Sequence, residues 1–326
     1  MRRREFIGML GGAAAWPIAA AAQTPGHVYR FGWLNPLSRP ELNRLMSVLA
    51  IFDEMRLAGF VEGQNLEVLD EGLGAKETEL AAVAAALIKA LPDVILVAGY
   101  VFAKAAQTAT RTIPIVAVSE DMVADGFSTS LARPDGNVTG LSLLTSTLDG
   151  KRGDLLRQVL PSLRQMAVLA DPSVDSAAHI TELKALAAMR GLELSAFFAR
   201  TKDEVIPALN AAKASGAGAV NVLASPLFYY NHRLIIERLR DLVLPAVYQW
   251  PDWADQGALI GYGPSQDLEG RILGRQLLKI LRGTAPSDIP IEQPTKFELA
   301  INLKTAKVLG LDMPPTLLAS ADRIIE

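Results

Sequence analysis

Short apolar runs alternate with amphipathic helical stretches along the chain from His27 onwards. The runs are rich in Val, Ile and Leu, which predicts buried strands, and apolar positions between them recur at helical spacing. Gly59 and Gly191 each follow such a stretch and predict its end. We expect strands at 28–34, 66–69, 93–98, 113–118, 165–170, 192–198, 219–223 and 244–248, and helices at 41–58, 77–90, 177–189, 202–215 and 232–242.

The strand and helix units fall into two successive blocks, which predicts two α/β lobes with parallel sheets. The chain has 326 residues, more than one domain of about 100–200 residues. The glycine-punctuated stretch 136–142 indicates a first crossing between lobes, and 257–263 and 286–294 are candidates for two more. We therefore expect one lobe from 27–141 and 258–290, and a second from 142–257 and 291–326.

The first 25 residues have the three parts of an export signal. Three arginines from Arg2 to Arg4 open the chain, an Ala- and Gly-rich apolar run follows, and Ala20-Ala21-Ala22 is a small-residue end. The run, residues 8–22, is shorter than the roughly 20 residues that span a bilayer. We expect residues 1–22 to be a cleaved signal peptide and the mature protein to be periplasmic.

The segment Arg3-Arg4-Glu5-Phe6-Ile7 resembles the twin-arginine export motif. Arg2 stands where that motif usually has Ser or Thr, so the general export route remains an alternative. A basic N-terminus with no targeting role is the other alternative.

Charge and cysteine content narrow the function classes. A formal net charge of -3 argues against nucleic acid as a partner, because phosphates require a basic face. The sequence has no cysteine, which excludes disulfides, thiolate metal sites and a lipid anchor on an N-terminal cysteine. The three histidines, His27, His179 and His232, are far apart in sequence, so we expect no multi-histidine metal site.

Sequence signatures of catalysis are missing. The chain has no Gly-x-x-x-x-Gly-Lys-Ser/Thr loop, no Gly-x-Gly-x-x-Gly after a strand and no Gly-x-Ser-x-Gly elbow. We therefore expect neither a cofactor nor enzymatic activity.

Polar, glycine and tyrosine residues follow the predicted strands in both blocks. Ligands of open α/β sheets bind outside the carboxyl ends of the strands, so these residues are candidates for a small-molecule site. Asp121 can hold a ligand ammonium group or cap a helix, and both readings stay open. The candidate ligand-binding residues are Asn35, Gly99, Tyr100, Asp121, Thr139, Asp171, Ser225, Tyr248 and Tyr262.

Five segments resemble motifs of the ABC transporter substrate-binding proteins of the tryptophan/tyrosine-permease type. Together they extend over essentially the whole mature chain. They are Phe31-Gly32-Trp33-Leu34-Asn35-Pro36, Gly59-Phe60-Val61-Glu62-Gly63-Gln64-Asn65-Leu66, the stretch 131–140 (LARPDGNVTG), Glu292-Gln293-Pro294-Thr295-Lys296-Phe297-Glu298-Leu299, and the stretch 301–307 (INLKTAK).

This resemblance implies the type I periplasmic-binding fold, with two Rossmann-like lobes, three crossovers and a ligand in the cleft. It also implies a receptor that binds a small molecule, such as an aromatic or branched amino acid, and docks on an ABC permease in the inner membrane. We expect this receptor to be a monomer. The chain departs from the family pattern at Tyr100, Glu120, Met122 and Ser225. These positions are at expected pocket edges, so the identity of the ligand stays open.

Two other functions are compatible with the sequence. A binding protein that presents its ligand to a membrane sensor would have the same fold. An exported α/β enzyme would require a nucleophile and a base that no motif supplies. A gene regulator with this kind of sensor would carry an N-terminal helix-turn-helix, and the leader occupies that place.

Overall fold

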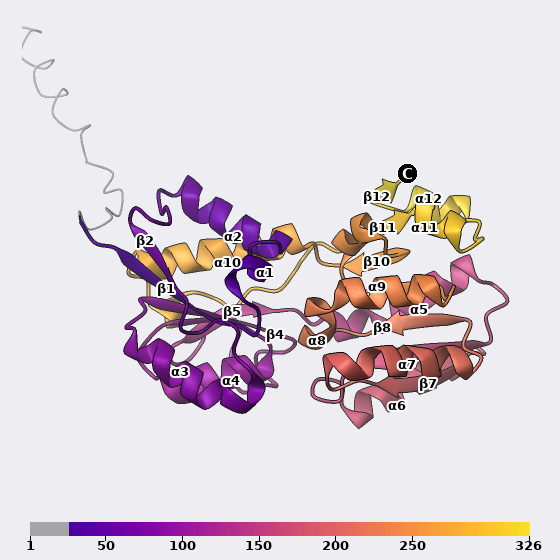
Figure 1. Ribbon diagram of the computed structural model, residues 1–326, viewed down its shortest axis with the longest axis horizontal. Helices are drawn as coiled ribbons and strands as arrows, with labels where there is room; N and C mark the ends of the chain where they lie inside the picture. Colours follow the sequence, from indigo (N-terminus) through magenta and orange to yellow (C-terminus); the bar gives the residue numbers. More distant parts are fainter. Residues whose placement is uncertain (1–25) are drawn as a thin grey trace, which may run out of the picture.

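The computed structural model describes residues 26–326, so the expected signal peptide at 1–22 lies outside the described part. The chain forms two α/β lobes, each built around one sheet (Figure 1). This confirms the predicted fold class. Within residues 26–326, none of the helices combines the length and the apolar character needed to cross a bilayer.

The first lobe contains a five-stranded parallel sheet in the order β2-β1-β3-β4-β5. Helices α2 and α10 cover one face, where Phe31, Ile51 and Leu277 are buried together. Helices α3 and α4 cover the other face. The strands are β1 (Tyr29–Leu34), β2 (Leu66–Leu69), β3 (Val94–Ala98), β4 (Ile115–Ser119) and β5 (Val138–Ser142); the helices are α1 (Arg39–Leu42), α2 (Met46–Leu57), η1 (Glu77–Glu79), α3 (Leu80–Lys89), α4 (Tyr100–Ala109), α10 (Gln266–Leu281) and η4 (Pro286–Asp288).

The second lobe contains a seven-stranded sheet in the order β12-β11-β10-β9-β8-β6-β7, in which only the pair β10 and β11 is antiparallel among the described strands. Helices α5 and α6 pack on one face and α7 and α9 on the other. Its strands are β6 (Gln165–Ala170), β7 (Glu193–Phe198), β8 (Ala219–Val222), β9 (Ala246–Tyr248), β10 (Ile260–Gly263), β11 (Glu298–Asn302) and β12 (Arg323–Ile325); its helices are η2 (Thr145–Leu148), α5 (Asp149–Val159), α6 (Ala177–Ala188), α7 (Lys202–Ala214), α8 (Pro226–Tyr230), α9 (His232–Asp241), η3 (Pro251–Gln256), α11 (Leu303–Val308) and α12 (Pro315–Ala319).

The chain passes between the lobes three times. It leaves the first sheet after β5, returns between β10 and α10, and leaves again between η4 and β11. Figure 1 shows the late segment α10 lying beside α2 in the first lobe. The expected boundary at 258 precedes β10, which pairs in the second sheet, so we place the second crossing after Gly263. Ile291 packs in the core of the first lobe, so the third crossing follows it.

Two predicted segments differ from the structure. The helix expected at 41–58 is divided into α1 and α2, because Leu45 is extended and starts the second helix. The segment 136–142, expected as a crossing, contains the buried strand β5, and the chain crosses only after Ser142.

Strand ends from both lobes bring polar residues to one region. In the first lobe Asn35 follows β1, Gly99 follows β3, and Glu120 follows β4. In the second lobe Asp171 follows β6 and Gln249 follows β9. Parallel strands align their carboxyl ends, so each sheet presents its loops to the other lobe.

Candidate ligand site between the lobes

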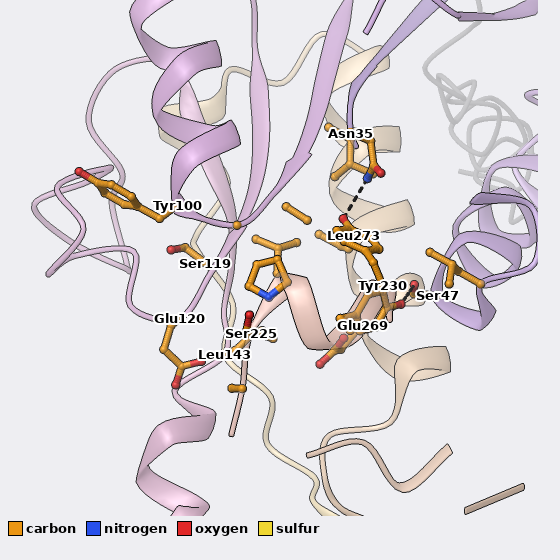
Figure 2. A pocket seen from close by; sticks show the side chains of 18 of the residues that line it. Asn35, Ser47, Tyr100, Ser119, Glu120, Leu143, Ser225, Tyr230, Glu269 and Leu273 are labelled. Carbon is orange, nitrogen blue, oxygen red and sulfur yellow. Dashed lines mark hydrogen bonds between the residues drawn. The ribbon is translucent and has the colours of Figure 1, made fainter. Parts of the chain in front are cut away.

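A cavity of about 390 Å³ lies between the lobes and is lined by residues of both. This volume is in the range of small-molecule sites, about 300–1,000 Å³. Its walls are mainly apolar and aromatic, with a few polar groups (Figure 2). The aromatic residues that line it are Trp33, Tyr100, Tyr229, Tyr230 and Trp250, and the aliphatic ones include Leu42, Leu45, Val48, Ile51, Leu96, Val118, Leu143 and Leu273.

Direct contacts join the lobes beside the cavity. Asn35 Nδ2 of the first lobe donates to the Tyr230 hydroxyl of α8 at 3.1 Å. Ser47 Oγ and the Tyr229 hydroxyl, also from different lobes, are 3.0 Å apart. A Cβ atom built on Gly99 would lie 2.9 Å from Pro226 Cγ, so the backbone of β3 meets α8 closely. The lobes are therefore in contact around the cavity.

The aromatic wall of the second lobe is a packed cluster. The Tyr229 ring meets the Trp250 ring edge-to-face, with 4.8 Å between centroids, and Trp250 lies 4.8 Å from Trp253. Burial raises the pKa of Tyr229 and raises that of Tyr230 to about 12, so both phenols keep their protons at neutral pH. The wall is therefore neutral, rigid and suited to a flat apolar group.

Carboxyl groups that follow β4 line the edge of the cavity. Asp121 Oδ1 accepts hydrogen bonds from the backbone N–H groups of Val123 and Ala124, at 3.0 and 3.1 Å. Asp121 therefore caps the turn that follows β4, where the described chain has no helix, and the residue also lines the cavity. Asp125 accepts a hydrogen bond from the Ser119 hydroxyl.

Ser225 connects the cavity to a buried carboxylate. Its hydroxyl donates to Asp171 Oδ2 at 2.5 Å and accepts from the Leu227 N–H at 3.0 Å, which caps α8. Asp171 Oδ1 accepts from both the N–H and the hydroxyl of Ser173. Asp171 thus positions two residues of the cavity wall and does not itself line the cavity.

We expect Ser225→Ala to destabilise the protein by about 2–4 kcal/mol. The substitution leaves a buried oxygen of Asp171 without that donor, which costs about 1–3 kcal/mol, and removes a helix cap worth about 1 kcal/mol. Urea unfolding measures the loss. Ser176→Ala is the matched control, because Ser176 caps α6 at the surface through the His179 N–H. Equal losses in the two variants would contradict this account of Asp171.

Glu269 is the most deeply buried acid in the cavity wall. Burial, with the nearby charges of Asp252 and Glu120, raises the pKa of Glu269 to about 8. The Trp250 indole lies beside it and lowers this pKa slightly, although Glu269 Oε1 and Trp250 Nε1 are not within hydrogen-bond geometry. The carboxyl is therefore largely protonated at neutral pH when the cavity is empty.

The cavity brings together five of the nine predicted ligand-binding residues, namely Asn35, Gly99, Tyr100, Asp121 and Ser225. The other four do not line it. The Thr139 hydroxyl donates to the Ile289 carbonyl in the core, and Tyr248 packs among buried apolar residues of the second lobe. Asp171 lies behind Ser225, and Tyr262 packs against the core on the α5 side. We leave these four out of the proposed contact set.

Sequence reasoning missed the aromatic wall and Glu269. Tyr229 and Tyr230 are at the end of α8, and Trp250 is two residues after β9. The pair Tyr229-Tyr230, four residues beyond Ser225, was the available signal. Glu269 is in the first turn of α10, after a crossing, where no strand-end rule applies.

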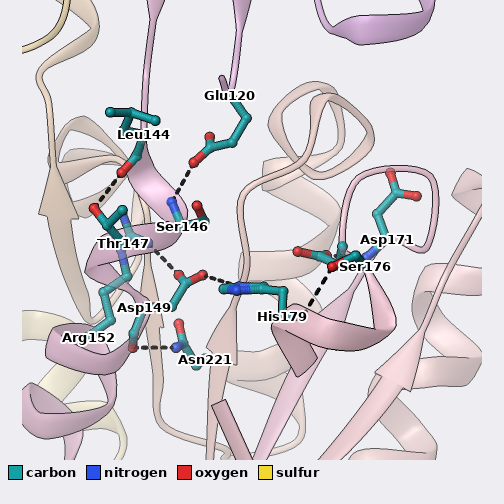
Figure 3. Close-up of polar contacts among 11 residues, drawn as sticks. Glu120, Leu144, Ser146, Thr147, Asp149, Arg152, Asp171, Ser176, His179 and Asn221 are labelled. Carbon is teal, nitrogen blue, oxygen red and sulfur yellow. Dashed lines mark hydrogen bonds and ion pairs between the residues drawn. The ribbon is translucent and has the colours of Figure 1, made fainter. Parts of the chain in front are cut away.

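A second buried polar group lies beneath the first crossing, at the start of α5 (Figure 3). Asp149 binds Arg152 Nη1 at 2.5 Å and His179 Nε2 at 3.1 Å. The hydrogen bond to Asp149 raises the pKa of His179. Glu120 Oε1 accepts from the Ser146 N–H at 2.5 Å, which joins the end of β4 to η2. No group in residues 26–326 has three His, Cys, Asp or Glu side chains placed to hold a metal ion.

Comparison with known proteins identifies the family. The model of the family described as ABC transporter substrate binding protein matches residues 36–325. The chain belongs to this family. The match confirms the predicted family and the expectation that the chain is not an enzyme, because the family binds substrates for transport.

Relatives of this family member include a curated protein and several solved structures. A tyrosine-binding protein of Clostridioides difficile (strain R20291) is 25% identical over 258 residues, 78% of this chain and 73% of the relative. The ABC domain from Streptococcus pneumonia in complex with L-Trp has a TM-score of 0.78 at 21% identity, over 91% of this chain and 100% of that chain. A conserved domain protein from Vibrio cholerae has a TM-score of 0.80 at 24% identity, over 91% of this chain and 99% of that chain.

Proposed function

We propose that this protein is an exported receptor that binds a small organic molecule between its lobes and delivers it to an ABC permease in the inner membrane. The ligand class we propose is an amino acid with an aromatic or branched side chain. The observation that carries the proposal is the cavity, which is lined by both lobes of a substrate-binding fold and walled by apolar and aromatic side chains.

The contents of the cavity favour this ligand class. The rings of Trp33, Tyr229 and Trp250 provide flat apolar surfaces for a side chain. Acidic residues line the cavity, and no Lys, Arg or His is among its lining residues in the described chain, which suits an ammonium group. The Clostridioides difficile relative is named for binding tyrosine, and the streptococcal structure holds L-Trp.

Hinge closure is the proposed mechanism. A ligand that contacts Asn35 in the first lobe and Ser225 in the second stabilises the closed arrangement, in which the lobes meet. A shift of the open and closed populations from 1:99 to 99:1 requires about 5.5 kcal/mol of differential binding. The contacts Asn35–Tyr230 and Ser47–Tyr229 form only when the lobes are together, and they contribute to the closed state.

The proposed location and partner rest on the leader and on the family. Residues 1–22 carry the features of a cleaved signal, with a twin-arginine-like segment. Cleavage of the leader would release the receptor into the periplasm, where we expect it to be a monomer. There, the closed form would dock on its permease.

Thermal unfolding of the mature protein against a panel of amino acids, aromatic acids, purines and sugars tests this proposal. A ligand at 100 times its dissociation constant should stabilise the protein by about 2.7 kcal/mol. Ala98→Trp fills the cavity and should abolish the shift, because Ala98 is part of its lining. Ala178→Trp, on the exposed face of α6, is the matched control and should keep the shift. Absence of any stabilising ligand in the panel would count against the receptor function.

A further inference from the structure

Glu269 is a buried carboxyl group that lines the cavity and has one oxygen without a hydrogen-bond partner in the described chain. Its exposed fraction is 7%, and its Oε1 atom makes no hydrogen bond within the described chain. Figure 2 shows the Glu269 side chain directed into the cavity, toward the region of Ser225 and Tyr230. An unpaired buried polar atom costs about 1–3 kcal/mol, so a group that pairs with it on binding gains affinity.

The other carboxyl groups of the cavity are already engaged with donors of the protein. Glu120 accepts the Ser146 N–H at 2.5 Å. Asp121 caps the turn that follows it, and Asp125 accepts from Ser119. Glu269 differs from these three acids because it alone of the four is buried and has a buried oxygen without a hydrogen-bond partner in the described chain.

The groups that face Glu269 from the neighbouring elements are acidic or neutral. Asp252 of η3 and Glu120 after β4 both act on it as like charges. Tyr229 of α8 is a protonated phenol, and Trp250 contributes a neutral indole.

The nearby cations are engaged elsewhere. Arg271 of α10 pairs with Glu54 of α2 at 3.0 Å. Arg323 lies 3.3 Å from Asp252. None of the residues that line the described cavity is a cation.

We infer that Glu269 is the residue that recognises a cationic group of the ligand, so that the cavity selects organic molecules carrying an ammonium or guanidinium group. This inference rests on the proposed receptor function and deepens it. The positive charge would pair with the Glu269 carboxylate and lie against the rings of Trp250 and Tyr229, where a cation–π contact adds to the ion pair.

Binding of the cation is coupled to release of a proton. The pKa of Glu269 is about 8 in the empty cavity, and a paired cation lowers it because it favours the charged form. Below about pH 8 the carboxyl group must lose its proton when the cation binds. Affinity therefore rises with pH up to about 8 and falls again when the ammonium group of the ligand loses its own proton.

Isothermal titration calorimetry with three related probes tests the inference. The probes are L-tryptophan, tryptamine, which lacks the carboxylate, and 3-indolepropionate, which lacks the amine. Titrations at pH 7 in two buffers of different ionisation enthalpy give the number of protons released. We expect L-tryptophan and tryptamine to bind with proton release, and 3-indolepropionate to bind at least 100-fold more weakly. Glu269→Gln should weaken both amines at least tenfold and abolish the proton release.

Two controls separate a binding role from a folding role. Asp267→Asn changes a half-buried acid in the same turn of α10, outside the cavity, and should bind the amines like the wild type. The protonated Glu269 contributes stability that is present below the unfolded pKa, near 4.5, and is lost as the pH rises through about 8. The wild type should therefore lose thermal stability relative to Glu269→Gln as the pH rises from about 5 to 8. A cooperative thermal transition of Glu269→Gln shows that the variant is folded.

The outcomes distinguish this inference from the receptor function. Equal binding of L-tryptophan by the wild type and Glu269→Gln, or binding of 3-indolepropionate as tight as that of tryptamine, would overturn the inference and leave the receptor function in place. A matching amine and non-amine pair from the wider panel serves the same purpose if indoles do not bind. Absence of binding by every probe and every panel member would overturn both.

Discussion

Replacing Gly140 with alanine should destabilise the protein by more than about 4 kcal/mol, the range of the most damaging single substitutions. Gly140 is in the middle of β5 and has φ +145, a backbone conformation that residues with a side chain rarely adopt. A Cβ atom there would overlap the carbonyl group of Ala117 on the neighbouring strand β4. The strand has no room to move away, because the Gly140 carbonyl accepts hydrogen bonds from the Glu292 N–H at 2.9 Å and from Gln276 Nε2 at 3.0 Å.

Gly136→Ala is the matched control in the same segment. Gly136 also has positive φ, +84, but a Cβ atom there would meet nothing within 4 Å. Its replacement should cost about 1 kcal/mol, from backbone strain alone. Urea unfolding, or soluble yield if Gly140→Ala does not fold, measures the difference. Similar stabilities for the two variants would show that β4 and β5 separate easily at Gly140.

The contacts of β5 explain why this strand tolerates so little change. It is the last strand before the first crossing, and the chain that leads to the third crossing runs beside it. The Thr139 hydroxyl donates to the Ile289 carbonyl at 2.6 Å, and the Ser142 N–H donates to the Glu292 carbonyl at 2.9 Å. Thr139, predicted as a ligand-binding residue, thus joins two of the segments that lead to the crossings.

Eight strands could be predicted because their apolar runs are continuous. Of these, β2 and β6 have the predicted bounds, and the other six differ by one or two residues at an end. β5 and β10 lie in segments expected as crossings, and β11 and β12 were not predicted. The pattern gave no prediction for α5 or α10. In α5 the buried face includes Asp149, Arg152 and Gly153, so it has no apolar stripe. In α10, Gly270 and Gly274 allow close packing on α2, and glycines in sequence suggest a turn.

The site could be predicted in part for a related reason. The strand-end rule places Asn35, Gly99 and Ser225 at the cavity because it depends only on strand direction. It does not say which way a side chain turns, and Tyr248, still within β9, packs into the core while Trp250 reaches the cavity. Residues such as Glu269 arrive from a helix that follows a crossing, so their position depends on how the two lobes meet.

Breaking the buried ion pair of α5 is the second substitution with a large expected effect. The side chains of Arg152 and Asp149 are 0% and 1% exposed, and their closest atoms are 2.5 Å apart. Arg152 Nε also donates to the Tyr262 carbonyl at 2.9 Å, and Asn221 Nδ2 donates to the Asp149 carbonyl. Figure 3 shows Asp149 with Arg152 and with Asn221 of β8. These contacts hold the start of α5, directly after the first crossing, against β8 and β10.

Arg152→Met should cost about 3–5 kcal/mol, because it leaves the Asp149 carboxylate buried without its guanidinium. His179, 3.1 Å from the same carboxylate, keeps part of the compensation and favours the lower end of that range. The control is Arg190→Met. Arg190, which follows α6, pairs with Asp154 of α5 at 2.7 Å, but the two side chains are 35% and 30% exposed, so the loss should stay below about 1 kcal/mol.

A double variant separates the charge from the packing. Asp149→Leu combined with Arg152→Met removes both charges of the pair, and it should recover at least about 1 kcal/mol relative to Arg152→Met alone. Urea denaturation of the wild type, the single variants Asp149→Leu and Arg152→Met, and the double variant measures the coupling. A double variant no more stable than Arg152→Met would mean that the guanidinium acts through its contact with the Tyr262 carbonyl. The start of α5 would then depend on the join to β10 and not on neutralisation of Asp149.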